Sequence, residues 1–236
     1  MSKFIETYNC NLVEPYEIAS NVILSYHYKG CKNPTKIGKA ARIHSGTVIY
    51  ADTIIGEHFT CGHNVTIRAE CIIGDRVVIL HNCTLEGKIS IGKGVKIMAH
   101  VYIPSRTIIG DMVFIGPGVT ILNSKLPMRE SVISGVTIGN NVMIGGGVTI
   151  CPGVTIGDNV FVGAGANVTK DIPPNSLAYG NPAKLKPLPA KFGKRNDPKQ
   201  IFSGLDLWND VPDDGAWKNE DFYGKDEWLS EMETHL

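Results

Sequence analysis

Long apolar runs, a net charge and closely paired cysteines are all missing from this sequence. No stretch reaches the roughly 18 apolar residues of a transmembrane helix, so we expect no membrane partner. Lys and Arg balance Asp and Glu at 23 each, so no overall field favours nucleic acid. The N-terminal residues show no basic start followed by an apolar core and a cleavage site. These features favour a cytoplasmic protein that acts on a small molecule.

The six cysteines show no CxxC spacing, which argues against a redox motif or a zinc site built from cysteine pairs. Three of them occupy positions where the repeat described next requires a small or apolar side chain. We therefore interpret them as reduced thiols, and expect no metal site from them. The six are Cys10, Cys31, Cys61, Cys71, Cys83 and Cys151.

An aliphatic residue or cysteine recurs at every sixth position. The series is unbroken from Ile37 to Ile121, and the same frame resumes at Val132 and continues to Val168. A period of six fits neither a helix nor a simple hairpin sheet. A glycine also follows the aliphatic residue at intervals of 18, as at Gly56 and Gly74, so three hexads make one coil.

This pattern predicts an all-β fold, a parallel β-helix of about seven triangular coils running from Ile37 to about Pro173. Each coil is expected to contain three short strands, with aliphatic side chains inside and Gly, Asn or Asp at the corners. We expect residues 1–36 to form an irregular N-terminal cap, residues 37–186 the β-helix domain, and residues 187–236 a C-terminal tail. The tail is acidic towards its end and holds all three tryptophans.

The frame is interrupted once. The coil that begins at Ile109 takes 29 residues to reach Ile138 instead of 18, so eleven residues are inserted. We expect them to form a loop near residues 122–131 that leaves one corner of the prism. Long excursions from a regular scaffold are often functional.

Two strings, IGDNVFVGAGANVTKDIPPNSLAYGNPAK and VTIGNNVMIGGGVTICPGVTIG, resemble the hexapeptide-repeat acyltransferases. They are most similar to the N-acetyltransferases that act on nucleotide-linked amino sugars, and the resemblance covers Ile37 to about Lys184. It implies a left-handed helix and acetyl-CoA as co-substrate. It also implies a homotrimer in which loop 122–131 borders the active site of a neighbouring subunit.

The catalytic histidine of the family has no counterpart here. HNCTLEGKISIG resembles the stretch that carries the base of the amino-sugar N-acetyltransferases, but that position is Gly87. IGPGVTILNSKLP resembles the equivalent stretch of galactoside and maltose O-acetyltransferases, where the base falls at Leu126. A missing base typically costs a hydroxyl acceptor 10²- to 10⁴-fold. A neutral amine is already a nucleophile and depends more on being positioned.

One branch of the family, the 3-amino-sugar N-acetyltransferases, works without such a base. Its motifs resemble GPGVTILN and LHNCT, which contain Asn123 and Asn82. The resemblance implies that these two asparagines position the sugar amine, and His81 and His100 are the alternative catalytic residues. The chain beyond Asn123 departs from that branch, so the identity of the sugar does not transfer.

A run of glycines indicates where acetyl-CoA would bind. Gly145 and Gly146 lie 18 residues before Gly163 and Ala164 at one predicted corner, where missing side chains leave room for a pantetheine arm. The family resemblance adds two candidate partners for the CoA phosphates. These are Lys170 and Lys184.

Three other functions remain open. The first is O-acetylation of a sugar hydroxyl. The second is a metalloenzyme similar to the γ-class carbonic anhydrases, which GHNVTIRAECIIGD resembles, although the second metal histidine of that motif is replaced by Arg68. The third is a non-catalytic trimeric scaffold.

Overall fold

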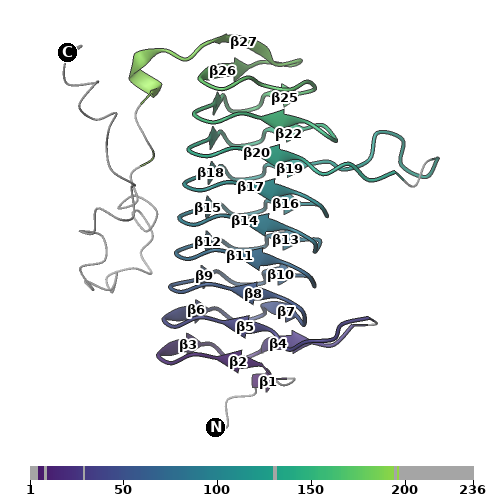
Figure 1. The fold of residues 1–236 in the computed structure, drawn as a ribbon, viewed down its shortest axis with the longest axis vertical. Coiled ribbons are helices and arrows are strands. Elements are labelled where there is room, and N and C mark those ends of the chain that lie inside the picture. The colour runs from purple at the N-terminus through teal and green to yellow at the C-terminus, as the bar shows by residue number, and fades with distance from the viewer. Residues whose placement is uncertain (1–4, 8–9, 29, 130–131, 194–195, 197–236) are drawn as a thin grey trace. The chain divides into compact units, whose positions relative to one another are not determined.

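The computed structural model describes residues 5–7, 10–28, 30–129, 132–193 and 196. Its architecture is the predicted left-handed parallel β-helix, in which short strands stack into three flat faces (Figure 1). Face 1 contains, in spatial order, β1 (Ile5–Thr7), β4 (Val22–Tyr26), β7 (Val48–Tyr50), β10 (Thr66–Ile67), β13 (Thr84–Leu85), β16 (Tyr102–Ile103), β19 (Thr120–Ile121), β22 (Thr149–Ile150) and β25 (Asn167–Val168).

The other two faces follow the same order along the prism. Face 2 contains β2 (Asn11–Leu12), β5 (Lys36–Ile37), β8 (Ile54–Ile55), β11 (Ile72–Ile73), β14 (Ser90–Ile91), β17 (Ile108–Ile109), β20 (Thr137–Ile138) and β23 (Thr155–Ile156). Face 3 contains β3 (Tyr16–Ile18), β6 (Ala41–Ile43), β9 (Thr60–Cys61), β12 (Val78–Ile79), β15 (Lys96–Ile97), β18 (Phe114–Ile115), β21 (Met143–Ile144), β24 (Phe161–Val162), β26 (Ser176–Tyr179) and β27 (Lys184–Pro187).

The hexad residues form the core. Ile73, Ile91 and Ile109 are register partners on successive coils of face 2, and each is about 2% exposed. Pairing of identical positions 18 residues apart stacks isoleucine on isoleucine along the prism and keeps water out of its interior. Strands β5 to β25 make seven such coils, as the periodicity predicts.

The glycine of each coil is required by the coil that follows it. A Cβ on Gly92 would overlap the backbone of Gly110 and the carboxylate of Asp111. That carboxylate accepts a hydrogen bond from the backbone N–H of Lys93 at 2.8 Å. The corner between faces 2 and 3, here the 2–3 corner, therefore needs glycine for close stacking and an Asp or Asn to satisfy a turn amide.

The prism begins before residue 37, where an irregular cap was expected. Strands β2, β3 and β4 form an additional coil, and Leu12 pairs with Ile37 in register. Leu12, Ile18 and Leu24 already follow the six-residue period. The next core residue, Ile37, comes 13 positions after Leu24 instead of six. An insertion between β4 and β5 hides the earlier part of the repeat.

The predicted long loop is present. Ile109 pairs with Ile138 across the 29-residue interval, and the loop leaves the prism after β19 and returns before β20 (Figure 1). The frame does not resume at Val132, which is 65% exposed, but at Ile138, which is buried. The loop is therefore longer than residues 122–131. It leaves from the corner between faces 1 and 2, the 1–2 corner, as does the N-terminal insertion.

The C-terminal end of the prism is closed by a change of strand direction. β27 pairs with β26 in antiparallel register, and a 3-10 helix, η1 (Ala190–Phe192), follows. Phe192 stacks on Phe161 with ring centroids 4.6 Å apart. Residues 197–236, which include the acidic, tryptophan-containing part of the tail, lie outside the described residues.

Candidate functional site

The corner between faces 3 and 1, the 3–1 corner, carries a column of residues with positive φ. In its N-terminal half the column consists of Asn21, Gly46, Asn64, Asn82 and His100, with φ between 57° and 77°. A Cβ on Gly46 would meet the side chain of Asn64. In its C-terminal half it consists of Gly118, Gly147 and Gly165, with φ between 66° and 69°. A Cβ on any of these three glycines would have no atom within 4 Å. The corner thus changes from a ridge of polar side chains to an open strip of bare backbone.

The glycines singled out from the sequence lie at this corner but mostly face the next coil. A Cβ on Gly145 would lie 2.5 Å from the backbone nitrogen of Ala164. A Cβ on Gly163 would meet the side chain of Tyr179 at 3.3 Å. Gly145 and Gly163 are therefore explained by stacking. Gly147, the last glycine of the run that begins at Gly145, and Gly165, which sequence reasoning missed, border open space. Their signal was a glycine at the third position of each corner, two residues after Gly145 and Gly163.

The two candidate lysines lie at different corners. Lys184 begins β27 and pairs with Tyr179, which immediately precedes the last turn of the 3–1 corner. Lys170 precedes Asp171 at the 1–2 corner. Both are exposed. Within one chain only Lys184 lies beside the glycine strip.

The histidines of the 3–1 corner form a ladder. The rings of His63 and His81 are stacked with centroids 5.4 Å apart, and His44 meets His63 edge-on at 5.0 Å. The backbone N–H of His63 donates to Nδ1 of His81 at 2.9 Å. Neutral His81 therefore carries its proton on Nε2. Burial, together with the neighbouring His63 and His100, lowers the pKa of His81.

These contacts limit what His81 can do. Its Nδ1 lone pair is engaged and its Nε2 is protonated, so neutral His81 can donate a hydrogen bond but has no free lone pair with which to take a proton. His100 lies one coil further along and is exposed. Asn82 is also exposed, and its side-chain oxygen accepts a hydrogen bond from the amide of Asn64 at 3.4 Å.

Asn123 lies at the 1–2 corner, at the root of the long loop. Its backbone oxygen accepts a hydrogen bond from Ser134 at 2.9 Å, which ties the two ends of the loop together. Its side chain is half-buried and bonds to no other residue among those described. Asn82 and Asn123 therefore lie at different corners, and one chain does not bring them together.

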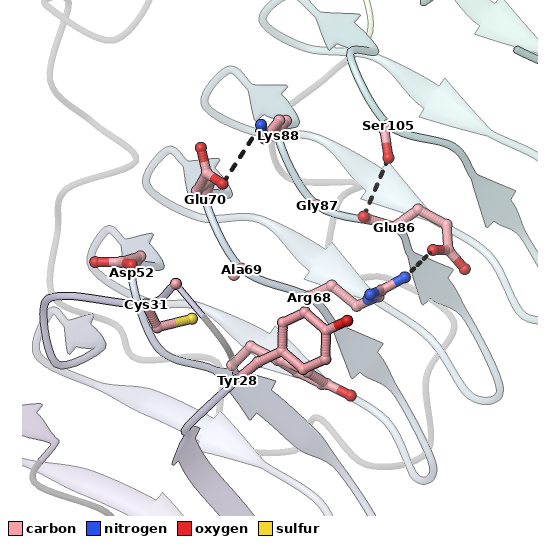
Figure 2. A pocket seen from close by; sticks show the side chains of 12 residues that line it. Tyr28, Cys31, Asp52, Arg68, Ala69, Glu70, Glu86, Gly87, Lys88 and Ser105 are labelled. Carbon is pink, nitrogen blue, oxygen red and sulfur yellow. Dashed lines mark hydrogen bonds and ion pairs between the residues drawn. The ribbon is translucent and has the colours of Figure 1, made fainter. Parts of the chain in front are cut away.

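The 1–2 corner also holds a cleft that the sequence did not reveal. It has a volume of about 240 Å³, and its floor includes Ala69 and Gly87 (Figure 2). Tyr28 reaches it from the N-terminal insertion, while Arg68 and Glu86 come from two successive coils. The sequence signal was weak because a loop residue and two corner residues 18 apart meet only when the insertion folds back.

Metal and thiol chemistry find little support here. Among the described residues, no group of three His, Cys, Asp or Glu side chains is arranged to hold a metal ion. Arg68, the residue at the metal-histidine position of the anhydrase motif, instead binds Glu86. The six cysteines are free thiols, and burial raises the pKa of Cys61 and Cys71 to about 12. No described helix is long and apolar enough to cross a membrane.

The sequence matches the family model "Bacterial transferase hexapeptide (six repeats)" over residues 88–123 and 135–170. A Bacillus cereus protein described as a "putative acetyltransferase" is 31% identical, with 77% of this chain and 90% of that protein covered and a TM-score of 0.49. A hexapeptide-repeat acetyltransferase from Vibrio cholerae, solved with acetyl-CoA, is 30% identical over 54% of this chain and 70% of that one, with a TM-score of 0.42.

The galactoside O-acetyltransferase of Escherichia coli is 49% identical over 84 residues, which is 33% of this chain and 41% of that enzyme. A relative from Saccharomyces cerevisiae described as a "putative acetyltransferase" is 40% identical over 88 residues, which is 34% of this chain and 45% of that protein. This chain thus spans under half the length of the curated relatives it matches.

Proposed function

Because the chain belongs to the hexapeptide-repeat transferase family, we propose that it moves an acetyl group from acetyl-CoA to the amine of a nucleotide-linked amino sugar. The observation that carries this proposal is the open strip formed by Gly118, Gly147 and Gly165. It provides backbone without side chains along three successive coils, where an extended pantetheine arm can approach closely.

The acetyl-CoA part rests on the strip and on a neighbouring cation. Strands of successive coils lie about 4.8 Å apart, so three coils offer a surface on the order of 10 Å long. Gly146 and Ala164 flank the strip, and the exposed Lys184 lies at its C-terminal end, suitable for a phosphate of CoA. The acetyl-CoA complex of the Vibrio cholerae relative supports the same co-substrate.

The amine part rests on the missing base. The amine attacks the thioester carbonyl, the C–S bond breaks, and the amine proton leaves to the CoA thiolate or to water. A hydroxyl acceptor needs a base as it attacks, but Gly87 and Leu126 supply none and His81 has no free lone pair. O-acetylation is the second candidate, favoured by the name of the Escherichia coli relative.

A homotrimer is part of the proposal. The glycine strip lies at the 3–1 corner, whereas Asn123 and the long loop lie at the 1–2 corner. If acetyl-CoA binds the strip, the group that positions the acceptor must come from the 1–2 corner of another copy, and a ring of three closes such a heterologous contact.

The test separates acetyl-CoA binding from transfer. Isothermal titration with acetyl-CoA should show one site per chain, and release of free CoA thiol should depend on an amino-sugar nucleotide. The matched acceptor with a hydroxyl in place of the amine should give little turnover. Equal turnover with the hydroxyl substrate would favour the O-acetyltransferase, and no acetyl-CoA binding would reject the proposal.

A further inference from the structure

The cleft at the 1–2 corner is an organised site. The Arg68 guanidinium donates to Glu86 Oε2 at 2.6 Å, and it lies 5.7 Å from the ring centroid of Tyr28 and 5.9 Å from that of Tyr50. A charge-assisted hydrogen bond and two cation–π contacts hold the guanidinium in one place. Figure 2 shows Tyr28 beside the Arg68 side chain, which extends towards Glu86.

Hydrogen bonds to Asp52 and a contact between two aromatic rings hold Tyr28 and Tyr50 in place beside Arg68. The carboxylate of Asp52 accepts hydrogen bonds from the backbone N–H groups of Lys32 and Asn33, each at 2.7 Å. These bonds hold the N-terminal insertion against the coil that carries Tyr50. Tyr28 meets the Tyr50 ring edge-on at 6.3 Å. Asp52 therefore acts as a positioning residue for Tyr28.

The chemistry of the walls favours a sugar ring. Tyrosine rings offer apolar faces to the C–H groups of a pyranose. A guanidinium has five N–H donors and a carboxylate has acceptor sites on both oxygens, so Arg68 and Glu86 each keep capacity beyond their mutual bond. Ser105, whose hydroxyl donates to the Glu86 backbone oxygen at 3.2 Å, adds a further acceptor. Apolar faces beside donors and acceptors match the two kinds of surface on a sugar.

The volume of the cleft and the charges of its lining residues restrict the kind of ligand that it can bind. The cleft of about 240 Å³ is smaller than the roughly 300–1,000 Å³ of sites that enclose drug-sized ligands. It therefore has room for one ring and not for a complete nucleotide sugar. Three carboxylates, those of Asp52, Glu70 and Glu86, face two cations, Arg68 and Lys88. A surplus of negative charge disfavours a phosphate and suits an amino sugar.

We propose that this cleft binds the pyranose ring of the acceptor amino sugar, with Tyr28 packing on the ring and Arg68 and Glu86 binding its hydroxyl groups. The inference rests on the proposed acetyltransferase function. The cleft and Asn123 share a corner column, in which Ser105 is one coil from Asn123. A ring in the cleft would project its amine along this column towards Asn123 and the long loop.

Saturation-transfer NMR with glucosamine and with galactosamine tests the ring site directly. Wild-type protein should transfer saturation to the ring protons of at least one sugar, and Tyr28→Ala and Glu86→Gln should reduce that transfer several-fold. The controls are Tyr16→Ala, a tyrosine of the first coil outside the cleft, and Glu57→Gln, a glutamate paired with Lys39 at 3.4 Å at another corner. Both controls should behave like wild type.

The outcomes separate this inference from the proposed function. No transfer to either sugar, unchanged transfer in both cleft variants, or displacement of the sugar by UMP would overturn the ring site. Acetyl-CoA titration on the same variants tests the other half. If acetyl-CoA fails to bind while the sugar binds, the acceptor role fails but the sugar site stands. If acetyl transfer occurs and the cleft variants keep the wild-type KM for the acceptor, the cleft is not the acceptor site.

Discussion

The surroundings of His81 determine whether this histidine can act as a general base. His81 is the best-placed imidazole, yet a backbone N–H occupies its Nδ1, and its stacking on His63 disfavours a positive charge. The same surroundings affect His44, whose pKa is lowered by burial and by His63 and His81. The lowered pKa values of His44 and His81 favour their neutral forms, and the ladder resembles a structural stack more than a proton relay.

The lowered pKa values of His44 and His81 make the stability of the fold depend on pH. The pKa values of His44 and His81 are lowered from 6.5 in the folded chain, so the unfolded chain takes up protons first as the pH falls. Their stabilising contribution is present above about pH 6.5 and is lost as the pH falls through the lower folded values. Thermal unfolding should therefore occur a few degrees lower at pH 5.5 than at pH 7.5.

A double variant and a control identify the source. His44→Gln combined with His81→Asn should flatten this pH dependence, because neither position then titrates in this range. His27→Asn should leave it unchanged, since His27 is exposed and lies outside the ladder. An equally steep dependence in the double variant would assign the effect to other groups.

Asn123 offers the second test at the residue scale. If its half-buried amide positions the acceptor amine, Asn123→Ala should lower kcat/KM for the acceptor by about 1 to 3 kcal/mol of transition-state binding, roughly 5- to 150-fold. The Kd for acetyl-CoA should stay the same. Asn82→Gly, which keeps the positive φ of that position, should also weaken acceptor use.

The matched control is Asn159→Gly. Asn159 has φ of 56°, lies at the 2–3 corner and donates to Asn175 at 3.1 Å, far from either candidate site. Both Asn123→Ala and Asn82→Gly should lose more acceptor activity than this control. Full activity of Asn123→Ala under subsaturating acceptor would remove Asn123 from the site.

At the scale of the element, the buried strand residues repeat from coil to coil, whereas the residues at the corners vary. Each strand from β5 to β25 carries a buried aliphatic residue or cysteine, whereas one position of the 3–1 column changes from Asn64 and Asn82 to Gly118 and Gly147. Asparagine tolerates the left-handed conformation about as well as any residue with a side chain. Backbone geometry alone therefore does not require the change to glycine, and an extended ligand gives a reason for it.

Gly147→Asn tests this reason. The backbone already adopts the φ that Asn64 and Asn82 adopt, so the fold should persist with nearly unchanged thermal stability. The added amide would fill the strip, and the Kd for acetyl-CoA measured by calorimetry should rise by roughly tenfold or more, which corresponds to about 1.4 kcal/mol.

The control substitution is Gly153→Asn. Gly153 has φ of 75° but lies beside Ser134 at the 1–2 corner. The variant Gly153→Asn shows how an asparagine at positive φ affects the protein when the strip is left open. Its Kd for acetyl-CoA should therefore match that of the wild type. Equal weakening by both substitutions would point to a loss of structure instead.

The sequence predicted the coils well because each core position is specified by the same local rule. Ile91 and Ile109 are interchangeable as far as periodicity is concerned, and their pairing follows from counting 18. Counting fails where residues are inserted. The first coil was missed because the insertion before Ile37 breaks the frame, and Val132 was assigned to the core although it lies in the loop.

The site was harder to predict than the coils. Gly145 and Gly147 look alike in the sequence, and only the stacking of coils shows that one faces Ala164 and the other faces open space. Tyr28 and Arg68 are 40 positions apart, and their contact depends on how the insertion folds back. Such contacts between a loop and a scaffold have no period from which they could be read.

For the prism as a whole, the three corners are specialised. The 2–3 corner carries the Asp and Asn residues that satisfy turn amides, the 3–1 corner carries the glycine strip, and the 1–2 corner carries the cleft and both insertions. Under the proposed function, a single chain presents two half-sites at separate corners. A three-fold ring would place the strip of each copy against the cleft corner of the next.

Subunit complementation is the sharpest test of this arrangement. Wild-type protein should first show the mass of three chains of 25.6 kDa by light scattering. Gly147→Asn damages the half-site for acetyl-CoA, and Asn123→Ala damages the half-site for the acceptor, so at subsaturating substrates each variant alone should lose activity by the factors predicted above. If a site combines corners of two neighbours, unfolding and refolding the two variants together at equal amounts should restore about a quarter of wild-type activity, because random assembly pairs two intact corners at that frequency. Mixing the folded trimers without exchange should restore none. If the site lies within one chain, the refolded mixture will show no more activity than the average of the two variants, and a monomeric mass would lead to the same conclusion.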